Sequence, residues 1–103
     1  MIVILKRQDR VNYIISKAVI HYELSEDKLL GYVRKDYQLE RNHFIIKLLR
    51  EIADISFKEI GWICNTSESP VHVQLTRLNE DLRYDKELQQ RYNELENRIL
   101  TNT

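Results

Sequence analysis

The sequence predicts an all-α fold, a compact bundle of five or six helices that contains a helix-turn-helix. Apolar residues recur at helical spacing along most of the 103-residue chain. Two glycines and one proline are too few for a turn-rich β-sandwich. With 43% hydrophobic residues the chain can bury a core of its own. We therefore divide it into an apolar N-terminal segment of uncertain structure, 1–8, and one domain, 9–100.

Two helices are expected in the first third of the chain. Asp9 can cap a helix over residues 9–22. The apolar positions of this helix are Val11, Ile14, Ile15, Ala18, Val19 and Tyr22. Ser25 can cap a short second helix, and Gly31 can close it. The apolar residues of 32–39 do not recur at helical spacing, which predicts a loop that carries Arg34 and Lys35.

The clearest amphipathic helix begins at Glu40 and ends near Asp54. Its apolar face is formed by Phe44, Ile45, Leu48, Leu49 and Ile52. A last helix is expected after Asp85, which can cap it. The apolar face of this last helix consists of Leu88, Tyr92, Leu95 and Ile99.

Between these two helices the sequence predicts a helix-turn-helix. Ser56 and Glu59 have the spacing of a capping box, and Ser67 can cap the helix that follows the turn. We expect the two helices to share a core of Ile60, Ile63, Cys64, Val71, Leu75 and Leu78, with Leu82 continuing the stripe. Gly61 falls where the helices approach each other closely. An ordinary αα-hairpin is the alternative interpretation.

Composition excludes several classes of function. The sixteen basic residues balance the sixteen acidic ones, although residues 1–58 carry a net charge of +3 and residues 59–103 one of −3. Two glycines cannot build a glycine-rich phosphate loop, so we expect no bound nucleotide. His21, His43 and His72 are too far apart in the sequence for a zinc motif. No catalytic constellation is present, and we expect no enzymatic activity, metal or cofactor.

The solitary Cys64 cannot form an intramolecular disulfide, and we expect it to be a small buried residue rather than a nucleophile. The apolar run at residues 1–5 is too short for a signal sequence or a membrane span. These features predict a cytoplasmic protein without a membrane partner.

Four motifs follow one another in an order that is typical of one family. They are Asp27-Lys28-Leu29-Leu30, residues 41–52, residues 55–61 and Asp85-Lys86-Glu87-Leu88. In this order they resemble the C-terminal DNA-binding domain of the bacterial replication initiator DnaA, which belongs to the Trp-repressor-like superfamily. The resemblance implies a bacterial protein of replication or transcription regulation, with double-stranded DNA as its partner. It also implies that Arg34 enters the minor groove.

The signature motif of that family is altered in this chain. Aligning Val71 with the signature valine places Thr66, Ser67, Glu68 and Val73 at the signature arginine, aspartate and two histidines. We expect no ATPase domain of the family here. Residues 56–78 also resemble, more weakly, the last helix-turn-helix of sigma factors.

Our first hypothesis is a double-stranded DNA-binding module with the helix at 68–83 in the major groove. The expected base-reading residues are Thr66, Ser67, Glu68, Ser69 and Val73. Thr76 and Arg77 also point outward, and Arg77 is placed to hold a phosphate. Arg34 and Lys35 add a contact to the DNA backbone or minor groove.

The second hypothesis belongs to another class. The same scaffold can serve as a protein-interaction or dimerisation module that binds a second copy of itself or another protein. The balanced charge, the outward positions expected for Trp62 and Val73 and the unassigned apolar run at residues 1–5 favour it. A salt-dependent interaction with mixed-sequence duplex DNA distinguishes the two hypotheses.

Overall fold

The chain folds into helices joined by short connections, as the sequence predicts. The computed structural model describes residues 6–35 and 40–100. Within these ranges it contains no β-strand, so the all-α bundle is confirmed. The helices are α1 (Arg7–Tyr22), α2 (Glu26–Lys35), α3 (Glu40–Glu51), α4 (Phe57–Ile63), α5 (Glu68–Tyr84) and α6 (Lys86–Leu100).

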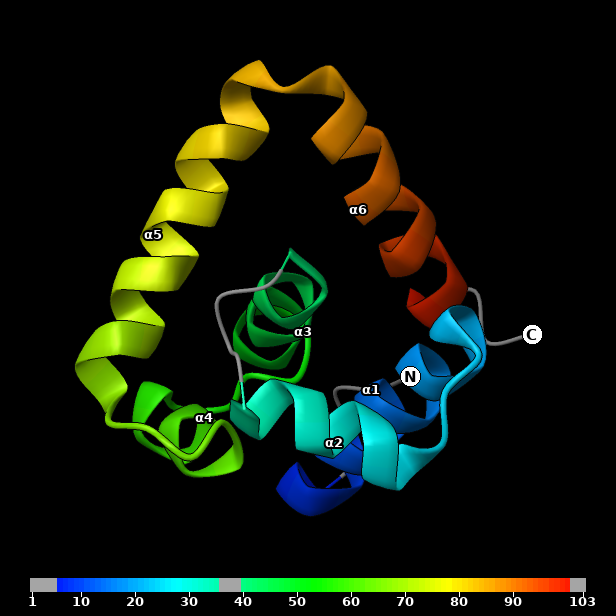
Figure 1. The fold of residues 1–103 in the computed structure, drawn as a ribbon, viewed down its shortest axis with the longest axis vertical. Coiled ribbons are helices and arrows are strands. Elements are labelled where there is room, and N and C mark those ends of the chain that lie inside the picture. Colours follow the sequence, from blue (N-terminus) through cyan, green and yellow to red (C-terminus); the bar gives the residue numbers. More distant parts are fainter. Residues whose placement is uncertain (1–5, 36–39, 101–103) are drawn as a thin grey trace.

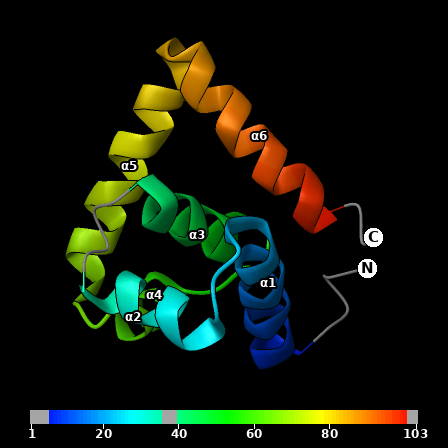
Figure 2. The ribbon, with the colours of Figure 1, turned by 45° about the vertical axis from the view of Figure 1, so that its right-hand side comes forward.

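Helix α3 lies at the centre of the arrangement. The long helices α5 and α6 meet at a corner and spread apart like the arms of an inverted V (Figure 1). Helix α3 lies between these arms, and α1, α2 and α4 close the open side (Figures 1 and 2). Helix α3 packs against α1, α4 and α5, while α1 packs against α6.

The position of α3 explains why so much of it is buried. Its buried residues are Asn42, Phe44, Ile45, Ile46, Leu48 and Leu49, a wider set than the amphipathic stripe of the sequence predicts. Two long-range hydrogen bonds add to this packing. The Tyr13 hydroxyl donates to the Ile99 carbonyl at 2.8 Å and joins α1 to α6. The Arg10 Nε donates to the Ala53 carbonyl at 2.6 Å and joins α1 to the segment that follows α3.

Three of the predicted helix caps are confirmed by hydrogen bonds. The Ser25 hydroxyl accepts from the Lys28 amide at 3.3 Å, and the Ser56 hydroxyl accepts from the Glu59 amide at 3.2 Å. Asp85 Oδ1 accepts from the Leu88 amide at 3.0 Å. Each bond satisfies an amide that has no partner inside its own helix. The expectation for Asp9 is wrong, because α1 begins earlier and places Asp9 inside its first turn.

Two further boundaries differ from the sequence prediction. Gly31 does not close α2, which continues to Lys35, so the predicted loop is wrong for residues 32–35, while 36–39 lie outside the described residues. The backbone of Gly31 lacks the left-handed conformation that ends a helix. Helix α3 ends at Glu51 rather than near Asp54, because Asp54 has a φ of 56° and allows the Ile55 amide to reach back to the Leu49 carbonyl.

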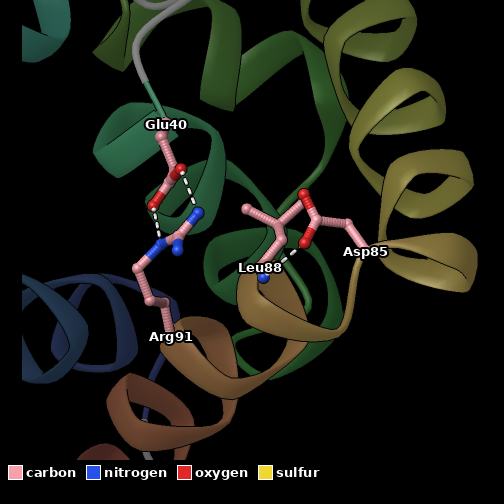
Figure 3. A network of polar contacts seen from close by, with 4 residues as sticks. All are labelled: Glu40, Asp85, Leu88 and Arg91. Atoms are coloured by element: carbon pink, nitrogen blue, oxygen red, sulfur yellow. Dashed lines mark hydrogen bonds and ion pairs between the residues drawn. The ribbon is translucent and has the colours of Figure 1, made fainter.

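Polar contacts join the corner between α5 and α6 to α3. Arg91 of α6 donates from Nε and from a terminal nitrogen to the two carboxylate oxygens of Glu40, at 2.8 and 3.0 Å (Figure 3). Glu40 is the first residue of α3, so this ion pair connects α6 to the start of the central helix. Both side chains are about half exposed, at 48% and 45%. The Asp85 cap lies beside the pair (Figure 3).

Candidate nucleic-acid interface

The connection between α4 and α5 is short and lies directly over Gly61. The Thr66 amide donates to the Gly61 carbonyl at 2.8 Å, and Asn65 adopts a left-handed backbone with a φ of 57°. A Cβ on Gly61 would lie 2.9 Å from the Thr66 carbonyl oxygen and 3.1 Å from two backbone atoms of Ser67. The expected close approach at Gly61 is confirmed, and its partner is the backbone of the turn.

A shared apolar core holds the two helices together. Its buried members are Ile60, Cys64, Val71, Leu75 and Leu78, all of them expected from the sequence, and Ile63 is half-buried. Burial raises the pKa of the Cys64 thiol to about 12. The thiol is therefore protonated at neutral pH, in agreement with the expectation of a small buried residue.

The outer face of α5 is exposed along its whole length. At 100° per residue, Ser69, Val73, Thr76 and Glu80 form one line opposite the buried Val71 and Leu75. All four are exposed, and Val73 retains 44% of its surface. The described parts of the other helices do not cover this line.

The start of α5 and its flank hold the other predicted residues. Ser67 and Glu68 are exposed, and Thr66 in the turn is half-buried. Ser67 occupies the N-cap position, but its side chain makes no capping hydrogen bond. Ser67 therefore has the expected position at the start of α5, but the expected capping hydrogen bond is wrong. Arg77 is also exposed, beside the central line.

Arg34 and Lys35 lie at the end of α2 rather than in a loop. Helix α2 packs against α4, and its C-terminal end lies close to α4 (Figure 1). The backbone of both residues is thereby near the helix-turn-helix, although their side chains lie outside the described part of the structure. The fold brings the two predicted segments to the same end of the molecule.

An aromatic stack that the sequence analysis missed supports the start of α5. The Arg50 guanidinium lies 4.6 Å from the centre of the Phe57 ring, and its Nη1 donates to the Ile55 carbonyl at 3.3 Å. The Phe57 ring meets the His72 ring edge-on at 4.8 Å between ring centres. These residues belong to α3, α4 and α5, so no periodicity within one helix indicates the contact.

Helix α4 presents a second exposed feature. Trp62 is 67% exposed, and the Lys58 ammonium lies 5.5 Å from the centre of its ring. The two residues are one helical turn apart on the outer side of α4. A side chain as large as tryptophan usually packs against neighbouring helices, but most of the Trp62 surface is in contact with solvent.

Charge on the helix-turn-helix is balanced rather than basic. Residues 56–84 hold three Lys or Arg (Lys58, Arg77, Arg83) and four Asp or Glu (Glu59, Glu68, Glu80, Asp81). Because phosphate contacts dominate the affinity of DNA-binding proteins, a DNA-binding role would require additional cations from outside this motif. The nearest predicted source is the end of α2.

A hollow lies where α3, α5 and α6 come together. It is lined by Glu40, His43, Leu78, Asp81, Tyr84, Asp85, Lys86, Glu87, Leu88 and Arg91. Glu40 is engaged by Arg91, and Asp85 caps α6. Nowhere in residues 6–35 and 40–100 do three or more His, Cys, Asp or Glu side chains form a group that suits a metal ion. No helix in those ranges is long and apolar enough to cross a membrane.

Comparison of the chain with protein-family models, with curated proteins and with solved structures finds no match.

Proposed function

We propose that this chain is a double-stranded DNA-binding module whose helix α5 enters the major groove. The observation that carries the proposal is the exposed outer face of α5, beginning directly after a tight turn. Ser69, Val73 and Thr76 lie on that face within the first three turns. Helix-turn-helix proteins read base edges with this part of their second helix. The resemblance of the sequence to DnaA C-terminal domains supports the same role.

Cations outside the base-reading line supply the affinity in this proposal. Arg77 flanks the line and is directed to a phosphate, which positions α5 without reading sequence. Arg34 and Lys35, at the end of α2, contact the DNA backbone or the minor groove. Glu80 lies on the outer line beyond Thr76 and repels phosphates. The groove therefore accepts only the first part of α5.

The test measures the affinity for a mixed-sequence duplex at several salt concentrations. Changing Arg34 and Lys35 together to Ala reduces the slope of log affinity against log salt by about 0.9 for each phosphate that the protein no longer binds. Arg77→Ala weakens all duplexes about equally and also reduces the slope. Arg98→Ala, an exposed residue near the far end of α6, is the matched control that leaves the slope unchanged. Absence of salt-dependent binding would contradict the proposal.

A protein-interaction module is the second candidate, and the exposure of Trp62 favours it. A tryptophan with 67% of its surface in solvent is typical of residues that become buried when a partner binds. Concentration-dependent self-association that Trp62→Ala abolishes, together with no affinity for DNA, would support this candidate. A monomer at all concentrations would contradict its homodimer form.

A further inference from the structure

The outer line of α5 has a restricted chemistry. Val73 contributes an apolar side chain with 44% of its surface exposed. The Thr76 hydroxyl donates to the His72 carbonyl at 2.9 Å, one turn earlier in the same helix. Because its donor hydrogen is used within α5, the Thr76 hydroxyl can only accept from a base, and the other group that Thr76 carries at its Cβ is a methyl group. Two neighbouring positions of the line therefore present apolar carbon.

The two amide side chains of α5, Gln74 and Asn79, are turned away from this line. Gln74 is buried, with 8% of its surface exposed. The Asn79 Oδ1 accepts from the Lys47 ammonium at 2.6 Å and faces α3. Adenine is read by paired contacts from Asn or Gln, and guanine by paired contacts from Arg or Lys. The outer line has none of these residues before Glu80 ends the part that can enter the groove.

An apolar line of this kind matches one feature of the major groove. Thymine presents a C5 methyl group there, whereas the other three bases expose only hydrogen-bonding groups and ring edges in the major groove. We propose, on the basis of the DNA-binding role above, that α5 recognises thymine methyl groups through Val73 and Thr76. Specificity then arises from methyl contacts, while the cations named above supply the affinity.

The test begins with a selection of tight-binding sequences from random duplexes. Each thymine of the selected site is then replaced in turn by deoxyuridine, which lacks the methyl group and keeps the base pair. For the parent protein, replacement at one or two positions weakens binding about fourfold each, the effect of one methyl group. Replacement at the remaining positions has no effect.

Two variants assign these positions to residues. Val73→Ala removes most of the exposed apolar side chain, and Thr76→Ser removes only the methyl group while it keeps the hydroxyl that bonds to His72. Each variant binds the thymine duplex more weakly and loses the sensitivity to deoxyuridine at its own position. Arg77→Ala is the matched control, since it weakens binding but keeps the sensitivity. Thermal unfolding followed by circular dichroism verifies that the variants fold.

The outcomes separate this inference from the DNA-binding role. Salt-dependent binding with no sensitivity to deoxyuridine at any position overturns methyl recognition and leaves DNA binding intact. Sensitivity that persists in both Val73→Ala and Thr76→Ser also overturns the assignment. No binding to any duplex overturns both proposals together.

Discussion

Two junctions of this chain join consecutive helices in different ways. At the α4–α5 junction backbone packs against backbone, and the turn lies so close to Gly61 that no side chain fits between them. The α5–α6 junction is a single residue, Asp85, in an extended conformation. Beside it Tyr84 is 81% exposed, and side-chain contacts bridge the corner. A hydrogen bond from the Gln89 side-chain amide to the Leu82 carbonyl joins α6 to α5, and the ion pair of Arg91 with Glu40 holds α6 to the start of α3.

The two junctions differ in how easily they accommodate a substitution. Backbone packing inside a core has no room to relax, so a small added group forces the whole turn to move. Side-chain contacts at a surface are individually weak, and water replaces them when they break. We therefore expect large effects at the α4–α5 junction and small ones at the α5–α6 corner.

The largest expected effect comes from Gly61. Gly61→Ala introduces a carbon 2.9 Å from the Thr66 carbonyl oxygen. It should lower the free energy of unfolding by about 1–3 kcal/mol, and the bulkier Gly61→Leu should unfold or loosen the domain. Urea unfolding followed by circular dichroism measures the change.

Gly31→Ala is the matched control for this prediction. A Cβ there meets nothing within 4 Å, and the position lies inside α2. Alanine should therefore raise the free energy of unfolding by roughly 0.5–1 kcal/mol through its better helix propensity. If the Gly61→Ala and Gly31→Ala variants are equally stable, the close approach of the turn to Gly61 is contradicted.

Cys64 provides a chemical probe of the same junction. Its thiol is buried at the end of α4 and has a pKa of about 12. At pH 8 the thiolate fraction is then on the order of one in ten thousand, so a thiol reagent should react at least a hundredfold more slowly than with the unfolded chain. Comparison of reaction rates in buffer and in urea checks this. Similar rates in both would show that the junction opens readily.

The helix caps are expected to have intermediate effects. Ser56→Ala and Asp85→Ala each remove a hydrogen bond to a helix-start amide and should lower the free energy of unfolding by about 1 kcal/mol. Ser67→Ala should lower the free energy of unfolding by only about 0.3 kcal/mol, because the Ser67 side chain makes no capping bond. Equal losses for Ser67→Ala and Ser56→Ala in urea unfolding would contradict the geometry at the start of α5.

The smallest effect is expected at the ion pair of the corner. Arg91→Ala removes a contact between two half-exposed side chains. The urea midpoint should stay close to that of the parent, and any difference should shrink when salt is added. A large loss of stability from Arg91→Ala would show that the α5–α6 corner is as constrained as the α4–α5 junction.

Much of this fold could be predicted from local sequence. The caps at Ser25, Ser56 and Asp85 were recognisable because a cap and its amide lie three residues apart. The buried stripe of α5 followed from helical spacing of Val71, Leu75 and Leu78. The end of α2 was missed, because a glycine can either close a helix or continue it, and its neighbours in the sequence do not decide which.

The candidate site was predictable to a similar extent. The exposure of Ser69, Val73 and Arg77 followed from the position of the buried stripe on the same helix. The stack of Arg50, Phe57 and His72 did not, because its members come from three helices. The uncapped side chain of Ser67 was also missed, since a capping residue can be recognised in sequence while its rotamer cannot.

The helical class, the stripes that face the core and the glycine under the α4–α5 turn all follow from the amino-acid sequence alone. These features depend on residues within a few turns of one another, where spacing alone decides which side chains share a face. Three other features appear only in the folded chain: the deep burial of α3, the hydrogen bond of Asn79 with Lys47, and the position of the end of α2 near α4. Each of these depends on helices that are distant in the sequence, and their contacts are set by packing of the whole core.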